Sequence, residues 1–261
     1  MKKKLPLIVT AMSILLFSCK KETIESPEPV PVVVNKKIVT TTFYSSLGAT
    51  FEYNADGTLK LILDKRNWGT YQYTFSYQPG KVIITGRNVA TNIIFETYNV
   101  ILNAKGYAST CERTIYDNNG NPLYTDNIQY KYNADDLLEQ SEEIGDYKIK
   151  YVYNSQQELV KSEYYDGAGN LKDYTEFQYG TTPDRFAAIG PASFSWFNFF
   201  LPARNKHLVT QSKQVNVVLN KVNWDCSFTY ELDKDGYVKK SIVDNTLPGG
   251  TDWEWINTWN K

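Results

Sequence analysis

A short pattern recurs along the chain and constrains its fold more than any other feature. In degenerate form it is an aromatic residue, any residue and a tyrosine, then a turn of Asn, Asp and Gly, then an apolar residue. It is seen in FEYNADGTLK, IYDNNGNPLY, YKYNADDLL, YVYNSQQEL, YYDGAGNLKDY and TYELDKDGYV, with FSYQPGKVII as a looser copy. Aromatic residues two apart lie on one face of a strand, and Asn, Asp and Gly tolerate the positive φ of a hairpin tip. The pattern therefore predicts a series of β-hairpins.

The spacing of the hairpin tips predicts the strand count. The clearest tips are Asp56-Gly57, Pro79-Gly80, Lys105-Gly106, Asn119-Gly120, Ala168-Gly169 and Asp235-Gly236. The gaps between them hold about fourteen to sixteen strands, and short connections make the sheet an antiparallel meander. The 20 Tyr, 12 Phe and 6 Trp residues suit a pleated sheet. Because so many strands seldom stay open and flat, residues 37–261 are expected to form a single all-β domain, curled into a barrel or half-barrel.

One segment, near residues 186–203, interrupts this rhythm. Pro191 and Pro202 bracket a run that contains Phe194, Trp196, Phe197, Phe199, Phe200 and Leu201. Proline favours the first turn of a helix and stops a helix from continuing, so the segment predicts a short helical or wedge-like aromatic insert. Two interpretations stay open: an insert that fills the core of the curved sheet, which is favoured, or a mobile lid or docking patch.

The first residues predict export and anchoring. Residues 1–18 have the form of a lipoprotein signal peptide, with lysines at positions 2–4 and an apolar run at 5–17 that is too short to span a bilayer. The sequence LFSC, which ends at Cys19, resembles a bacterial lipobox, so Cys19 is the expected lipidation site and membrane anchor. The alternating prolines of residues 19–36 predict an extended tether. The expected location is the outer membrane, with the domain either periplasmic or surface-exposed.

Together these features resemble a family of Bacteroidota lipoproteins with a domain of unknown function and a porin-like fold. Their degenerate hairpins are similar to the YD repeats of Rhs-type shell proteins. The residues that carry the resemblance are Cys19, the hairpins at Tyr53, Tyr132, Tyr153 and Tyr165, the group Tyr179, Pro183, Asp184 and Phe186, and Arg204-Asn205-Lys206. The resemblance covers most of residues 37–261. It implies a barrel or half-barrel and no catalytic residues.

Composition and spacing argue against several kinds of chemistry. The formal net charge of -1, without a basic stripe, argues against a nucleic-acid partner. The single histidine, His207, is interpreted as a solvated loop residue, and no metal site, cofactor or catalytic residue is expected. Asn54 and Asp56 fit part of a calcium loop, but position 12 of that loop would be Leu63 rather than Glu. Neighbours on a strand point to opposite faces, so Glu142-Glu143 does not predict a paired-carboxylate site.

The C-terminal sequence TDWEWINTWNK is the most suggestive candidate site. Trp253, Trp255 and Trp259 share strand parity and would line one face. Exposed, they would form a platform for sugar rings or a protein partner, and turned inward they would fill the core or line a cavity. With Phe194, Trp196, Phe197 and Phe200 they make up the candidate ligand or partner contact.

The remaining cysteines, Cys111 and Cys226, leave two alternatives. An exported protein permits a disulfide between them, and two buried free thiols are the favoured alternative.

Three function classes stay open after this reading. A non-enzymatic, lipid-anchored binder of a glycan or protein is favoured. A carrier of a hydrophobic molecule inside a half-barrel is the first alternative, because larger barrels enclose ligands. A carboxylate-based hydrolase is the second.

Overall fold

The protein is a closed antiparallel barrel. The structure, a computed structural model, describes residues 37–43, 47–185, 200–201 and 205–260, and Lys36–Lys261 form one compact unit. The strands are β1 Ile38–Phe43, β2 Leu47–Tyr53, β3 Leu59–Arg66, β4 Gly69–Gln78, β5 Lys81–Asn88, β6 Ile94–Leu102, β7 Ala108–Tyr116, β8 Pro122–Tyr132, β9 Leu138–Glu143, β10 Tyr147–Tyr153, β11 Leu159–Asp166, β12 Leu171–Pro183, β13 His207–Asn216, β14 Lys221–Leu232, β15 Val238–Asn245 and β16 Trp253–Trp259.

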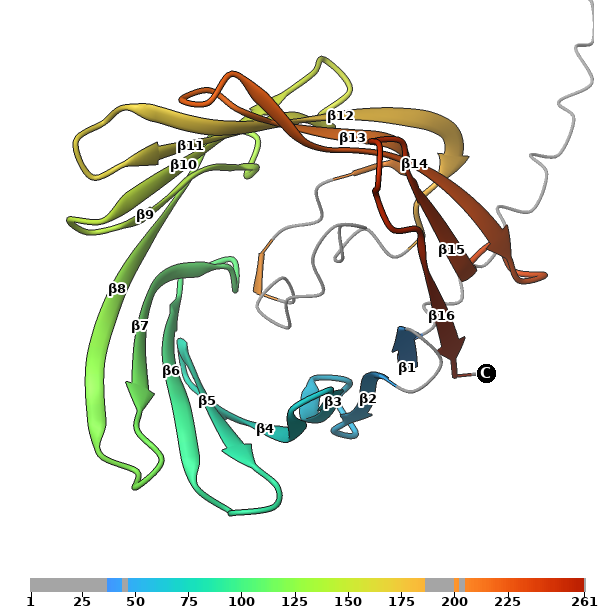
Figure 1. The fold of residues 1–261 in the computed structure, drawn as a ribbon. Coiled ribbons are helices and arrows are strands. Elements are labelled where there is room, and N and C mark those ends of the chain that lie inside the picture. Colours follow the sequence, from blue (N-terminus) through green and yellow to red (C-terminus); the bar gives the residue numbers. More distant parts are fainter. Residues whose placement is uncertain (1–36, 44–46, 186–199, 202–204, 261) are drawn as a thin grey trace, which may run out of the picture. The chain divides into compact units, whose positions relative to one another are not determined.

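Each strand pairs with its neighbours in the chain, and β1 pairs with β16, for example at Thr41 and Asn257. Figure 1 views the barrel along its axis, so that the strands form a ring. The all-β meander predicted from the hairpin tips is thus confirmed, and between the two predicted forms the structure is the barrel. Of the predicted insert at 186–203, only Phe200 and Leu201 belong to the described residues.

The Asn and Asp residues of the repeat build its turns. In the turn after β2, the Asn54 N–H donates to the Thr58 carbonyl (2.8 Å) and the Gly57 N–H donates to the Asn54 carbonyl (2.9 Å). The same two backbone bonds recur in the turns that begin at Asn103, Asp117, Asn133, Asn154, Asp166 and Asp233. In six of these turns the first residue's Oδ1 also accepts backbone N–H groups, as Asp117 does from Asn119 and Asn121, both at 2.8 Å. These Asn and Asp side chains therefore stabilise the backbone of their own turns, which is the role expected at hairpin tips.

The tyrosine of the repeat ties neighbouring strands together. Its hydroxyl donates to the carbonyl at the start of the preceding strand or two residues into it: Tyr53 to Ile38, Tyr132 to Ala108, Tyr153 to Leu138, Tyr179 to Leu159 and Tyr230 to Val209, at 2.5–3.0 Å. Each of these tyrosines except Tyr230 directly follows a register shift in its strand pair. A bulge displaces a residue from the ladder and bends the strand. The shift lies in the pair with the following strand, whereas the hydroxyl bonds a carbonyl of the preceding strand, so each of these four tyrosines ties the bulged strand to its other neighbour.

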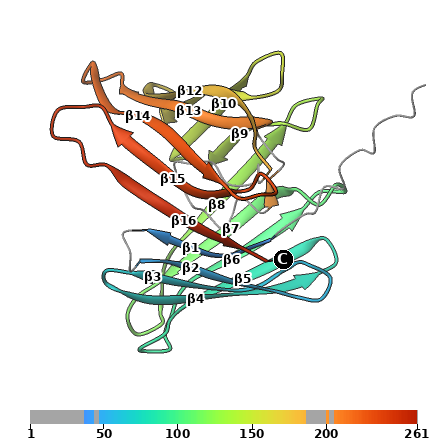
Figure 2. The ribbon, with the colours of Figure 1, turned by 90° about the vertical axis from the view of Figure 1, so that its right-hand side faces the viewer.

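The two ends of the barrel differ. Because the strands form a meander, alternate turns lie at alternate ends. We call the termini end the one that holds Lys37, Asn260 and the turns after β2, β4, β6, β8, β10, β12 and β14. The opposite end, with the turns after β1, β3, β5, β7, β9, β11, β13 and β15, is the rim end. Figure 2 shows the barrel from the side, with the turn between β15 and β16 on the left.

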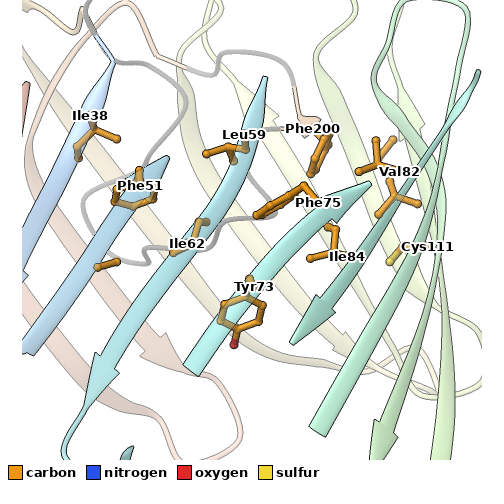
Figure 3. Packing of buried hydrophobic residues seen from close by; sticks show 13 residues of the cluster. Ile38, Phe51, Leu59, Ile62, Tyr73, Phe75, Val82, Ile84, Cys111 and Phe200 are labelled. Carbon is orange, nitrogen blue, oxygen red and sulfur yellow. The ribbon is translucent and has the colours of Figure 1, made fainter. Parts of the chain in front are cut away.

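The two faces of the wall also differ. Residues paired across strands lie on the same face, and one such row runs through Phe51, Ile62, Tyr73, Gly86, Glu96, Ile115 and Tyr124. Phe51, Ile62 and Tyr73 are buried in the core cluster, in which Phe200 packs on Phe75 (ring centroids 6.4 Å apart; Figure 3). This row therefore lines the inner wall.

The outer wall is polar. The adjacent row runs through Glu52, Leu61, Thr74, Thr85, Thr97, Thr114 and Thr125. Ion pairs cross the same wall, including Lys60–Glu52 (3.3 Å), Lys161–Glu163 (2.9 Å) and Lys240–Glu254 (2.7 Å). Within the described segments there is no helix long and apolar enough to cross a membrane.

Candidate binding site in the barrel lumen

The inner wall carries a hollow of about 610 Å³ toward the rim end. We call it the Glu96 pocket. It is lined by charged, aromatic and aliphatic side chains: Ile62, Asp64, Arg66, Tyr73, Phe95, Glu96, Tyr98, Cys111, Arg113, Ile115, Tyr116, Tyr124, Ile128 and Tyr130. Its volume lies in the range of pockets for small organic ligands. The pocket therefore offers apolar surface and hydrogen-bonding groups side by side.

Glu96 lies at the centre of the pocket and is 5% exposed. Its carboxylate accepts hydrogen bonds from the hydroxyls of Tyr73 (2.9 Å) and Tyr98 (2.6 Å), and it pairs with the guanidinium of Arg113 (3.2 Å). Arg113 also approaches Asp126 at 3.7 Å. A buried charge is tolerated when it is paired and hydrogen-bonded, and these contacts satisfy that condition.

A second arginine extends the same network. Arg66 pairs with Asp64 at 2.7 Å and donates to the Tyr73 hydroxyl at 3.4 Å. Its guanidinium also lies over the ring of Tyr71, 5.4 Å from the ring centre. Each arginine of the pocket therefore has its own carboxylate, so the pocket carries no unpaired positive charge that would demand an anionic ligand.

Tyr73 and Tyr98 of the pocket stay protonated. Burial, reinforced by the Glu96 carboxylate, raises the pKa of both Tyr73 and Tyr98 far above the usual range. Burial opposes the charge of Arg113, but Tyr98 and Glu96 outweigh it and raise the arginine's pKa. Tyr73 and Tyr98 thus present neutral hydroxyls, and Arg113 a positive charge, throughout the physiological pH range.

Glu143, beyond Asp126 on the same wall, leads to a pH prediction. Burial, with Asp126 as the next cause, raises the pKa of Glu143 above 4.5. The folded state then binds this proton more tightly than the unfolded chain, so the contribution of Glu143 to stability is fully present below pH 4.5 and is lost as pH rises through the folded pKa. We expect Glu143→Gln to raise Tm at pH 7 by about 1–2 °C and to leave it unchanged at pH 4. Thermal melts at both pH values measure this, and a stabilisation equal at both would contradict it.

The two carboxylates of the Glu142-Glu143 pair lie on opposite faces, as strand parity predicts. Glu142 faces outward, 4.0 Å from Lys148, whereas Glu143 lines the inner wall with Ile128 and Tyr147.

The C-terminal tryptophans face inward. Trp253 and Trp255 pack on the cluster of Val209, Cys226, Phe228 and Val243, and Trp259 packs on the larger core cluster. The Trp259 indole donates to the Val238 carbonyl (2.9 Å). Between the alternatives of an exposed platform and an inward row, the geometry is that of the inward row.

Two polar atoms of the inner wall are buried without a partner among the described residues: Nε1 of Trp253 and Oδ1 of Asp173. Asp173 belongs to a second hollow of about 290 Å³, with Ile149, Ser162, Tyr164, Tyr174, Thr175 and Gln214. Buried polar atoms are normally bonded. The lumen thus has hydrogen-bonding capacity beyond what its own described side chains use.

The aromatic insert is described only in part. Phe194, Trp196 and Phe197 lie outside the described residues. Phe200 is 7% exposed and lies beside Phe75 and Tyr77 on the inner wall, near the termini end. This residue therefore belongs to the core.

The cysteines are both free and buried. They belong to different clusters, Cys111 with Val82 and Val100, Cys226 with Val209 and Val243. Burial raises the pKa of the Cys111 thiol to about 12. The structure thus has the two buried thiols of the favoured alternative.

The interpretation of His207 as a solvated loop residue is wrong. His207 begins β13, and its Nδ1 lies 2.7 Å from Oε1 of Glu158, whose side chain is only 3% exposed. Glu158 is a buried acceptor that needs a donor, and the fold brings His207 to it across 49 positions.

The Glu96 pocket was missed by sequence reasoning. The sequence offered one indication of it. Glu96 and Tyr98 are two positions apart, with Thr97 between them, so they are expected on the same face of a strand. In the described residues no group of three or more His, Cys, Asp or Glu is placed to hold a metal ion.

Comparisons with known proteins concern the fold. The sequence matches no family profile and no curated protein. In structure, the chain is similar to a porin-like protein from Bacteroides uniformis, with a TM-score of 0.59, 18% identity, and coverage of 85% of this chain and 96% of that one. A porin-like protein from Bacteroides vulgatus aligns with a TM-score of 0.48 and 13% identity, over 85% of this chain and 98% of that one. The first comparison shows that the fold is that of a porin-like barrel, as the resemblance implied. The relation to YD repeats and the membership of a lipoprotein family stay predictions.

Proposed function

We propose that the barrel is a non-enzymatic binding protein of the cell envelope that holds an uncharged or weakly charged glycan in its lumen. The single observation that carries this proposal is the Glu96 pocket, in which aromatic rings and paired charged groups share one wall around a hollow of about 610 Å³. Sugars present hydroxyls on their rims and C–H groups on their faces. Carboxylates, arginines and tyrosine hydroxyls match the hydroxyls, and aromatic rings match the apolar faces.

The polarity of the wall supports a barrel that stands in water. Membrane-spanning barrels present an apolar band outward, and a basic residue on the lipid face near the midplane costs about 2–4 kcal/mol. Here Lys161, Glu176 and Lys213 form one outward row across the middle of β11, β12 and β13. Lipid attachment through Cys19 with a tether at residues 19–36 remains part of the proposal and would keep such a barrel at a membrane.

A carrier of a hydrophobic molecule is the second candidate, supported by the apolar inner wall at the termini end. Phe51, Leu59, Val82 and Val100 line that region, and Phe200 already packs there. The orphaned atoms of Trp253 and Asp173 and the charged Glu96 network favour a polar ligand for the rest of the lumen.

A titration tests the glycan proposal. The protein is titrated calorimetrically with malto-, cello- and xylohexaose at low and high salt. At least one should bind saturably, with an affinity that salt does not change, because the ligand is neutral. Tyr124→Ser should weaken binding at least tenfold, about 1.4 kcal/mol, since Tyr124 lines the pocket and is 53% exposed.

The matched control is Tyr165→Ser, because Tyr165 lies on the outer wall beneath Lys150. Binding should be unchanged in this variant, and the recovered oligosaccharide should be intact. Tight binding of a long-chain fatty alcohol with no response to any glycan would favour the carrier instead. Cleavage of the oligosaccharide would favour a hydrolase.

A further inference from the structure

Exposed apolar side chains gather at one end of the barrel. In the part of the chain that the structure describes, the large apolar residues at least 60% exposed are Trp68 (70%), Leu219 (69%), Val218 (63%), Leu123 (61%) and Ile144 (61%). All five lie at the rim end, in the turns after β3, β9 and β13 or at the start of β8. With Val89, 48% exposed in the turn after β5, they form what we call the apolar rim.

The termini end has the opposite character. Its turns carry Asp56, Lys105, Asp135, Gln156 and Lys234 at or beside their tips. Lys37 and Asn260, the first and last residues that the structure describes, lie there too, and the Lys37 N–H donates to Oδ1 of Asn260 (2.7 Å). Strongly exposed apolar tips are therefore found at the rim end only, among the described residues. They are not a general feature of the turns of this barrel.

The arrangement of the rim indicates what covers it. Turns at one end are two strands apart, so neighbouring tips are separated by roughly 10 Å along the barrel's circumference. Tips that are separated around a ring can all contact a flat surface at once. They do not form the contiguous apolar centre that a protein interface needs. A bilayer interface accepts such tips singly, and tryptophan is enriched at that depth.

The charges at the rim end indicate which kind of bilayer the rim would contact. The turns at 67–68, 89–93 and 217–220, which carry four of the six rim residues, contain no charged residue. Nearby Asp117, Asp146 and Asp252 lie in turns of the same end. An uncharged, zwitterionic bilayer matches this rim better than an anionic one.

Chain length permits the contact. Cys19 precedes Lys37 by eighteen positions, which span at most about 60 Å. The ten-residue strand β4 is about 33 Å long. A lipid on Cys19 would therefore leave enough chain for the opposite end of the barrel to reach the same membrane.

The geometry points to the apolar rim as a membrane-docking surface that inserts Trp68, Leu123, Ile144, Val218 and Leu219 into the head-group region of a zwitterionic bilayer. The Glu96 pocket lies toward the same end, so docking sets it over the head-group layer. The inference stands on the rim alone and does not require that the lumen bind a glycan.

Vesicle flotation tests the docking. The chain from residue 20 onward, which lacks the predicted leader and Cys19, is mixed with phosphatidylcholine vesicles. We expect it to float with them at low and high salt, and Trp68→Ser combined with Leu219→Ser to lower the bound fraction at least tenfold. The matched control, Ile101→Ser with Ile256→Ser, removes two 40%-exposed residues of the outer wall and should bind as the parent does.

Several results would overturn the inference: no flotation of the parent chain, equal loss in the rim and control variants, or binding only when phosphatidylglycerol is added. A dimer in sedimentation analysis that the rim variant abolishes would also overturn it, because the rim would then cover a second copy. Thermal melts establish that the variants are folded. Glycan titration of the rim variant should be unchanged, so the docking and the proposed lumen ligand can fail separately.

Discussion

Replacing Glu96 by alanine is expected to lower the free energy of unfolding by about 3 kcal/mol. The substitution removes the acceptor of the Tyr73 and Tyr98 hydroxyls and the main partner of Arg113. The two tyrosine hydroxyls then lose this acceptor in a largely buried place, which costs more than the bonds themselves contributed, and Arg113 keeps only Asp126, at 3.7 Å. Urea-induced unfolding, followed by tryptophan fluorescence, measures the change.

The control for this prediction is Glu52→Ala. Glu52 forms an ion pair with Lys60, but its side chain is 54% exposed on the outer wall, so the loss should stay within about 0.5 kcal/mol. A double substitution of Glu96 and Arg113 by leucine should cost less than the sum of the two single leucine substitutions, because each single change leaves the other charge without its main partner. If Glu96→Ala were as stable as Glu52→Ala, the network would not hold the wall together as described.

Gly48→Ala is the second substitution with a large expected effect, because it acts on the closure of the barrel. Gly48 has φ +148°, and a Cβ there would lie 2.0 Å from the Thr41 carbonyl oxygen and 2.8 Å from Thr42 Cα. Both are backbone atoms of β1, the strand that joins β2 to β16. They can yield only if β1 moves, and we expect a loss of about 3 kcal/mol, together with faster hydrogen exchange in β1 and β16.

Gly80→Ala provides the comparison. Gly80 also has positive φ, +69°, but nothing lies within 4 Å of its Cβ position. Only the cost of a left-handed alanine remains, about 1 kcal/mol. Equal losses at Gly48 and Gly80 would show that backbone conformation alone matters and that the close approach of β1 does not.

The candidate site could be predicted only in outline. The inward row of Trp253, Trp255 and Trp259 was correctly grouped by parity, which is local information. Parity does not say which face is inside, because the aromatic and the polar face of a strand can each be buried or wet. The network around Glu96 needed the five strands from β4 to β8 in register, since Tyr73, Glu96, Arg113 and Asp126 come from β4, β6, β7 and β8.

The sequence by itself determined the hairpins, their turns and the antiparallel order of the strands. Asn54, Asp117 and Asp233 act through hydrogen bonds to residues within four positions, so their effect is readable from neighbours in the chain. The tertiary structure alone decided that β1 closes on β16, that charges at Glu96 and Arg113 meet inside the lumen, and that Trp68 and Leu219 share one exposed rim. These contacts join residues far apart in the sequence, and their positions follow from the register and curvature accumulated over all sixteen strands.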